Sequence, residues 1–136
     1  MSATEEAHAA AVLALLNTAL TASFDASVRA YDLDEVSRLT TKPKRYVEVE
    51  VYRRFGDGAR LCGGKPTDLW RVLTRYVSDT VTNSRAMREA SRGALEMARV
   101  SVGGATTTPV QFETASSIQQ DNEHWWTGQD AWTYAH

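Results

Sequence analysis

The chain has 136 residues, of which 43% are hydrophobic and 24% are charged, and its formal net charge is −2. This length predicts one domain spanning residues 1–136, large enough to bury a core without covalent staples. A lone cysteine, Cys62, excludes an internal disulfide framework and a cysteine-ligated zinc site. No basic leader with an apolar run and no apolar stretch of about 20 residues is present, so we expect neither a signal peptide nor a membrane span.

Charge is distributed unevenly along the chain. Residues 1–44 carry four basic and six acidic side chains, residues 45–104 carry eleven and seven, and residues 105–136 carry none and four. An acidic last segment after a basic middle segment favours electrostatic contacts within or between copies. A dedicated nucleic-acid-binding protein would usually be basic overall, so the composition argues against that class.

Residues 4–22 have the pattern of an amphipathic helix. Thr4 can cap its start, and Glu5 and Glu6 suit its first turn. Its apolar stripe consists of Ala9, Val12, Leu13, Leu16, Ala19 and Leu20. The back of the helix is smooth, either because alanine favours helix or because a neighbouring chain covers it; it carries Ala7, Ala10 and Ala14. Residues 26–31 predict a short strand, and residues 32–44 a linker.

Residues 45–55 and 68–79 predict a long β-hairpin, because the first arm alternates between apolar and polar side chains and the second is rich in β-branched and aromatic residues. With Val51 opposite Val72, the core-facing pairs are Val49–Thr74, Val47–Tyr76 and Arg53–Trp70. The outward-facing pairs are then Glu48–Arg75, Glu50–Leu73 and Tyr52–Arg71. A slip by one residue would bury both glutamates, so burial fixes the parity of the pairing.

The segment between the two arms is too long for a tight turn and predicts a projecting loop. Its residues include Gly56, Asp57, Gly58, Arg60, Leu61, Gly63, Gly64 and Lys65.

A second helix is predicted from about residue 82, capped by Thr82, Asn83 or Ser84, to about Arg99. Its inner face comprises Met87, Ala90, Ala94 and Met97. An arginine stripe lies nearly opposite, formed by Arg85, Arg88, Arg92 and Arg99, with Glu89 and Glu96 beside it. Three interpretations of the stripe are open: a solvated face, a contact with acidic residues 113–130 of another subunit, or a contact with DNA phosphate.

The last part of the chain predicts a strand over residues 106–115, a polar loop over 116–129 and a strand over 130–135. The aromatic residues near the end suit either the edge of the core or an interface; they are Trp125, Trp126, Trp132 and Tyr134. The predicted fold is an α+β two-layer sandwich, a mostly antiparallel sheet of about five strands with two helices on one face, in the order α-β-β-β-α-β-β.

No catalytic constellation stands out, and we expect no catalytic residue, metal or cofactor. His8, His124 and His136 are too spread along the chain to suggest a metal site or a triad. Glu48 and Glu50 with Asp79 could form a nuclease-like carboxylate cluster, but a solvated strand face beside Arg71 and Arg75 is the simpler interpretation.

The chain resembles the tail terminator (tail completion) proteins of long-tailed bacteriophages, and the resemblance rests on an ordered series of features. After the N-terminal helix these are Tyr31-Asp-Leu-Asp-Glu-Val36, Arg45-Tyr-Val-Glu-Val-Glu-Val-Tyr-Arg-Arg-Phe-Gly56, Trp70-Arg-Val-Leu-Thr-Arg-Tyr-Val77, Asn83-Ser-Arg-Ala-Met-Arg88 and Asp130-Ala-Trp-Thr-Tyr134. Together they span nearly the whole chain.

The resemblance implies a non-enzymatic virion protein at the tail–neck junction, assembled in the host cytoplasm. It implies a homo-oligomer, a hexameric ring, that caps the tail tube protein, ends tube polymerisation and presents a docking surface to the head–tail connector or stopper protein. DNA would pass through the lumen without specific binding, and Glu48, Glu50, Asp121 and Glu123 are candidates for lining it.

We expect the subunit interface of such a ring to use Glu48, Glu50, Arg71, Arg75, Arg85, Arg88, Arg92, Trp125, Trp126, Trp132 and Tyr134. The projecting loop, with Gly56, Asp57, Gly58, Arg60, Leu61, Gly63, Gly64 and Lys65, would then be the arm that docks on the tube or the connector. The alternatives are another head–tail neck or connector component, a tail tube subunit, or, from a different class, a small metal-dependent nuclease.

Overall fold

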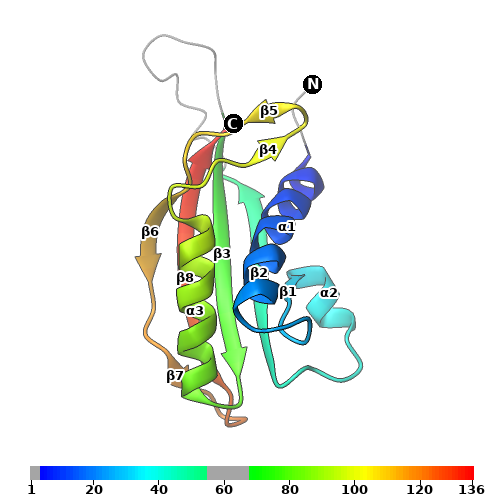
Figure 1. Ribbon diagram of the computed structural model, residues 1–136, viewed down its shortest axis with the longest axis vertical. Coiled ribbons are helices and arrows are strands. Elements are labelled where there is room, and N and C mark those ends of the chain that lie inside the picture. Colours follow the sequence, from blue (N-terminus) through cyan, green and yellow to red (C-terminus); the bar gives the residue numbers. More distant parts are fainter. Residues whose placement is uncertain (1–3, 55–67) are drawn as a thin grey trace.

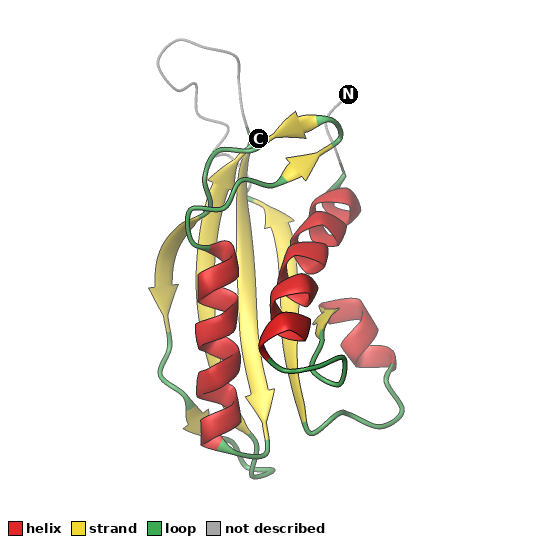
Figure 2. Cartoon of the chain, viewed as in Figure 1, coloured by secondary structure: helices red, strands yellow, loops and turns green. Residues whose placement is uncertain are grey.

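The computed structural model describes residues 4–54 and 68–136. The order of its elements is α1 (Glu5–Ser23), β1 (Ala30–Asp32), α2 (Leu33–Arg38), β2 (Arg45–Arg53), β3 (Leu69–Ser78), α3 (Val81–Leu95), β4 (Ser101–Val102), β5 (Ala105–Thr106), β6 (Gln111–Ala115), β7 (Gln119–Gln120) and β8 (Trp126–Ala135). The predicted α+β class is confirmed, and α1 and α3 lie side by side on one face of the main sheet (Figures 1 and 2).

The main sheet has the strand order β1-β2-β3-β8-β6, and β7 also pairs with β8. Only the β1–β2 pair is parallel; the other pairs in this sheet are antiparallel. The hairpin register is confirmed in full: Val51 lies opposite Val72, Glu48 opposite Arg75 and Tyr52 opposite Arg71. Strand alternation therefore sends the valine face of the hairpin towards α1 and α3 and the charged face outwards.

The core fills the space between the two helices and the sheet. α1 contributes Val12, Leu16 and Leu20, which are completely buried, while Ala7, Ala10 and Ala14 on its back are exposed. Thr4 caps α1 as predicted, because its hydroxyl accepts a 3.2 Å hydrogen bond from the Ala7 N–H. Burying a large aliphatic side chain is worth about 1.5–3 kcal/mol, so this stripe anchors α1 to the sheet.

A third helix, α2, replaces part of the predicted linker. Asp32 stands at its N-cap position, and Asp34 and Glu35 occupy its first turn. Its buried residue Val36 packs with Tyr46 and Val77, whose side chains point to the face of the sheet opposite α1 and α3 because they alternate with core residues. The linker expectation was wrong because one turn and a half of helix is too short to show a clear period.

The second predicted helix starts and ends earlier than its pattern suggested. Thr80 is the N-cap, and its hydroxyl accepts a hydrogen bond from the Asn83 N–H at 3.2 Å. The helix ends at Leu95 because the Met97 N–H bonds to the Val110 carbonyl, which draws the chain towards β6. Met97 has a φ of 62° and is 62% exposed, so its expected place on the inner face was wrong.

The C-terminal third contains more strand than expected. The strand predicted over 106–115 divides into β5 and β6, and the predicted loop over 116–129 contains β7 and the first four residues of β8. Gly103 and Gly104 form the turn between β4 and β5, where φ values of 60° and 82° favour glycine. Because β8 begins at Trp126, it pairs with the whole of β3, from Leu69 opposite Ala135 to Ser78 opposite Trp126.

Candidate functional site

The outward face of the β2–β3 hairpin is a mixed-charge surface. Arg71 donates a 3.2 Å hydrogen bond to the Tyr52 hydroxyl, which raises the arginine pKa, and forms a 3.0 Å ion pair with Glu113 of β6. Glu48 and Arg75 face each other in the register, but within the described residues no ion pair joins them. Arg75 is exposed and both glutamates are half-buried, so three charges on this face are available to a partner.

Three of the four residues expected to line a DNA path lie around one hollow. Glu48, Asp121 and Glu123 share its lining with Lys42 and Arg75. The Asp121 carboxylate also accepts hydrogen bonds from the N–H groups of Glu123 and Trp125, at 2.8 and 2.9 Å. This end of the outward face is therefore acidic with two cations beside it, and the DNA-path assignment itself stays a prediction.

The arginine stripe of α3 divides into two pairs with different surroundings. Arg85 and Arg99 are exposed, and Arg99 donates a long 3.4 Å hydrogen bond to the Thr107 carbonyl. Arg88 and Arg92 turn to the sheet instead and bind Asp130 of β8, which is completely buried. The acidic partner of Arg88 and Arg92 is thus a residue of the same chain.

Asp130 is the centre of a buried hydrogen-bond network. Its carboxylate receives two 2.9 Å hydrogen bonds from the Arg92 guanidinium and a 2.8 Å hydrogen bond from the Tyr76 hydroxyl. The bonds to Asp130 raise the Arg92 pKa, and burial followed by the nearby carboxylate raises the Tyr76 pKa, so the phenol stays protonated and donates. Thr74 extends the network by bonding to the Tyr76 hydroxyl and accepting from the Trp132 indole.

Arg88 ties the same network to the outer strands. Its Nη2 donates a 2.6 Å hydrogen bond to the Ser116 carbonyl, and its guanidinium lies 5.4 Å from the centre of the Tyr76 ring. A Cβ at Gly128 would stand 2.7 Å from this Nη2 and 2.7 Å from the Ile118 side chain. Glycine at this position of β8 therefore makes room for the arginine.

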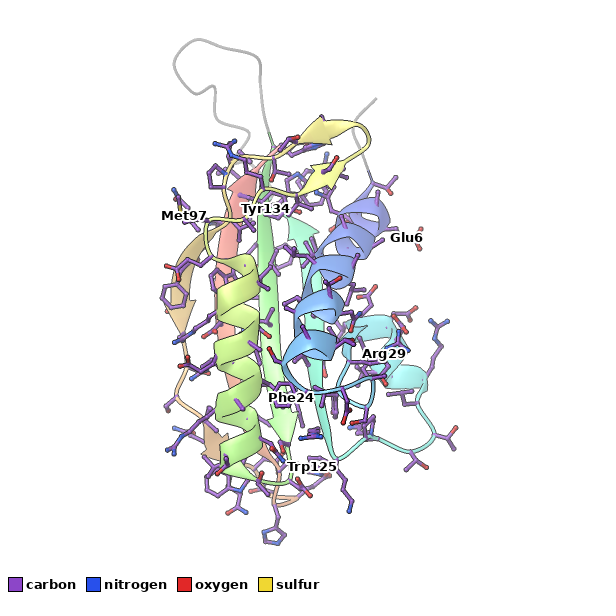
Figure 3. All side chains as sticks on the ribbon, in the orientation of Figure 1. Glu6, Phe24, Arg29, Met97, Trp125 and Tyr134 are labelled. Carbon is purple, nitrogen blue, oxygen red and sulfur yellow. The ribbon has the colours of Figure 1, made fainter. Side chains whose placement is uncertain are left out.

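The predicted aromatic cluster is two separate groups. Trp132 and Tyr134 are 1% and 2% exposed, so their side chains are core residues that offer almost no area to a partner. Trp125 and Trp126 are half-buried at the opposite end of β8, and Figure 3 places Trp125 far from Tyr134. Only the first two tryptophans remain suited to a subunit interface.

Two histidines that are far apart in sequence meet at the upper end of the sheet. His8 is completely buried, stacks on Trp70 with ring centres 3.6 Å apart, and shares a 2.7 Å hydrogen bond with the Tyr134 hydroxyl. The His136 ring lies edge-on at 4.8 Å. Burial, with a smaller effect of His136, lowers the His8 pKa from 6.5 to about 4 despite the opposing charge of Asp68, so His8 is neutral at pH 7.

The proposed docking loop, Gly56 to Lys65, lies outside the described residues. Within residues 4–54 and 68–136 no group of three or more histidine, cysteine or acidic side chains is placed to hold a metal ion. None of the helices in these ranges combines the length and apolarity needed to cross a bilayer.

Asp130 is the main residue that sequence reasoning missed. Its position two residues before Trp132 places a carboxylate on the apolar face of an alternating strand, and such a group needs a cationic partner when it is buried. The i, i+4 spacing of Arg88 and Arg92 supplies that partner. The two signals are 38 residues or more apart in sequence, and only the β3–β8 pairing brings them together.

The fold is shared with solved structures that have little sequence identity to the chain. One is a chain of the virion of a native gene transfer agent (GTA) particle, with a TM-score of 0.70 and 14% identity over 93% of this chain and 91% of that one. A second solved structure has a TM-score of 0.62 and 14% identity over 97% of this chain and 94% of that one. No family model and no curated protein matches the sequence. What the comparisons show is a fold shared with a chain of the gene transfer agent virion.

Proposed function

We propose that this chain is a structural virion protein of a long-tailed phage or phage-like particle, located where the tail meets the neck. Its copies form a hexameric ring that caps the tail tube, ends tube polymerisation and offers a surface to the head–tail connector or stopper protein. The observation that carries the proposal is the fold shared, over 93% of the chain, with a chain of the gene transfer agent virion. The ordered motifs that resemble tail terminator proteins support the finer assignment.

The surface chemistry supports assembly rather than catalysis. Closed rings need two different patches that fit each other on neighbouring copies, and the chain offers charged side chains on two faces: Glu48, Glu50 and Arg75 on the sheet, and the exposed Arg85 on α3. Trp125 and Trp126 add half-buried aromatic area at the lower end of the sheet. The acidic groups around the Lys42–Arg75 hollow suit a lumen through which DNA slides without being held.

The test is assembly with and without tube protein, followed by native mass spectrometry and electron microscopy. We expect closed rings of six copies, or monomers that become rings on the tube end and stop tube growth. A chain that polymerises into long tubes would instead be a tube subunit. A chain that stays monomeric and leaves tube growth unchanged would contradict the proposal.

A further inference from the structure

Large hydrophobic side chains are exposed at three positions in residues 4–54 and 68–136. They are Leu33, Met97 and Phe112, which are 44%, 62% and 46% exposed. Met97 and Phe112 are neighbours, because the Met97 N–H donates a hydrogen bond to the carbonyl of Val110, two residues before Phe112, and Figure 3 labels Met97 beside β6. We call Met97 and Phe112 the β6 patch. Exposed apolar side chains that lie together are typical of a surface that binds another protein.

The surrounding contacts hold both side chains of the β6 patch at the surface. The Phe112 ring stands edge-on to Trp132, with ring centres 5.4 Å apart, and the Arg92 guanidinium lies 5.3 Å from the centre of the Phe112 ring. Met97 has a φ of 62°, which is uncommon for a residue with a side chain, and its N–H bond to Val110 is 2.8 Å long. β6 is the last strand of the sheet, so in the part of the chain that the structure describes no further strand covers this edge.

The third exposed side chain lies at the opposite edge of the sheet. Leu33 is the first residue of α2, which follows β1, and β1 is the strand at the other end of the sheet (Figure 1). We call α2 with its N-cap residue the α2 edge. Heterologous contacts in a ring join two different surfaces of the same chain, and apolar surfaces at opposite edges of one sheet meet that requirement.

The two edges also differ in charge. The α2 edge carries three acidic residues and one arginine: Asp32, Asp34, Glu35 and Arg38. The side chains around β6 and Met97 include five arginines and three acidic residues: Arg54, Arg71, Arg88, Arg92, Arg99, Glu96, Glu113 and Asp130. The α2 edge therefore has an excess of two negative charges and the β6 edge an excess of two positive charges, so unlike edges attract each other.

The α2 edge and the β6 patch lie at nearly the same height along the strands. The strand register places Phe112 in one row with Trp132, Val72 and Val51. At the other edge Asp32 is opposite Val49, two residues from Val51 on β2, and Leu33 follows Asp32. At about 3.3 Å per residue, the heights differ by no more than about 7 Å. A rotation about an axis parallel to the strands preserves height, so it brings the α2 edge of one copy to the β6 patch of the next.

We propose that the α2 edge of one copy packs on the β6 patch of a second copy, with Leu33 covering Met97 and Phe112. This inference rests on the proposed ring, for which it names the two surfaces in contact. Because the surfaces lie at opposite edges of one chain, the contact is head-to-tail, and it repeats until the ring closes. It buries the three exposed apolar side chains and places the acidic α2 beside the arginines of the β6 edge.

Two variants, each altering one surface, test the proposal. Leu33→Glu removes the apolar side chain from the α2 edge, and glutamate suits the first turn of a helix. Met97→Asn with Phe112→Thr removes the β6 patch, since asparagine tolerates a positive φ and threonine suits a strand. Each variant alone is expected to be monomeric by native mass spectrometry under conditions in which the unmodified chain forms rings. An equimolar mixture is expected to give a 1:1 dimer and nothing larger, because each variant keeps the surface that the other has lost.

The matched control is Ala7→Glu, which also places a glutamate in the first turn of a helix, at an exposed position outside both surfaces; it is expected to form rings. Thermal melts and circular dichroism establish that each variant is folded. Should the double variant fail to fold, cross-linking replaces it, with Leu33→Cys in one copy and Met97→Cys in the other, both carrying Cys62→Ser. A bismaleimide reagent is expected to link the mixed copies into dimers and to link neither variant alone.

The outcomes separate this inference from the proposed function. If the unmodified chain never assembles, alone or with tube protein, both are overturned. If it forms rings and either variant forms them equally well, if the mixture gives no dimer, or if the mixed cysteine copies link no better than each alone, the contact surfaces are wrong and the ring stands. Rings of Leu33→Glu that no longer bind tube protein would assign the α2 edge to the tube, which also overturns this inference.

Discussion

Two polar clusters lie between the helices and the sheet, and they differ in charge. Beneath α3, the buried Asp130 is matched by two arginines and a tyrosine hydroxyl. Beneath α1, the buried His8 is neutral, stacks on Trp70 and has one hydrogen bond, to Tyr134. In the described part of the chain neither His8 Nε2 nor Trp70 Nε1 has a hydrogen-bond partner.

The difference shows two ways of burying a polar group. An ion inside a protein is tolerated only when opposite charges and hydrogen bonds surround it, and the Asp130 cluster therefore fixes α3 over β8 in one arrangement. A neutral imidazole needs less compensation, but its environment opposes protonation. The Asp130 cluster should lose its stabilising effect when one of its charged residues is removed, and the His8 cluster when the pH falls.

Removing the central carboxylate should have the largest effect. Asp130→Ala leaves Arg88 and Arg92 facing an apolar site, and breaking a buried ion pair in this way costs about 3–5 kcal/mol of unfolding free energy. Urea denaturation followed by circular dichroism measures the change. Glu123→Ala, at an exposed acidic residue, is the control and should stay within about 0.5 kcal/mol; a similar small loss for Asp130→Ala would mean that the cluster does not hold α3.

The same cluster changes the meaning of charge reversal on α3. Arg88→Glu with Arg92→Glu would place three carboxylates in one buried site, so a loss of assembly in that variant would report unfolding. Arg85→Glu is the variant that tests α3 in assembly, since Arg85 is exposed.

Lowering the pH should weaken the His8 cluster next. The unfolded chain binds a proton on this histidine near pH 6.5, whereas the folded chain resists protonation until about pH 4. The contribution of neutral His8 to the free energy of unfolding is therefore fully present above pH 6.5. It is lost as the pH decreases towards 4, and the loss is at most about 3 kcal/mol. Urea midpoints between pH 5 and 7 measure the slope before most carboxylates titrate.

His8→Phe should flatten this slope, because phenylalanine keeps the ring stack but cannot take up a proton. His124→Asn is the control: His124 is exposed with a φ of 68°, a conformation that asparagine tolerates, and the slope should remain. A slope that survives His8→Phe would assign the acid sensitivity to other groups.

Replacing either of two glycines by alanine should change the stability of the fold, in opposite directions at the two positions. At Gly128 a methyl group would meet the Arg88 guanidinium and the Ile118 side chain, and such overpacking costs about 1–3 kcal/mol. At Gly93, exposed in the last turn of α3, nothing lies within 4 Å of the new methyl group, so alanine should stabilise the helix by about 0.4–1 kcal/mol. Thermal unfolding of both variants measures the signs, and destabilisation by Gly93→Ala would contradict this account.

The features that depend on local pattern were predictable from sequence. The buried face of β2 followed from the alternation of valine with glutamate, and the α1 limits followed from Thr4 and the apolar stripe. Both signals lie within a few residues of the elements that they define. The α2 helix was missed because six residues are too few to display a period.

The candidate sites were less predictable because they depend on contacts between distant segments. Arg88 and Arg92 looked like surface residues on the helical pattern of α3 alone, and their partner lies on the last strand. The spacing of Met97 suits the inner face of a longer helix, but its backbone N–H binds the Val110 carbonyl and α3 ends before it. The buried positions of Trp132 and Tyr134 likewise follow from the pairing of β8 along the whole of β3. The sequence predicted a polar loop up to residue 129, and therefore a shorter last strand.

The smallest expected effect is the difference in stability loss when one tyrosine hydroxyl is removed from each cluster. Tyr76→Phe removes a hydrogen bond to the Asp130 carboxylate, and bonds to charged groups contribute about 1.5–3 kcal/mol. Tyr134→Phe removes the bond to neutral His8, for which about 0.5–1.5 kcal/mol is typical. Tyr76→Phe should therefore cost more, by about 1 kcal/mol, in urea denaturation at pH 7. Equal losses would mean that Arg88 and Arg92 satisfy the carboxylate without the phenol. The charge of Asp130 would then not increase the contribution of the Tyr76 hydroxyl to the free energy of unfolding.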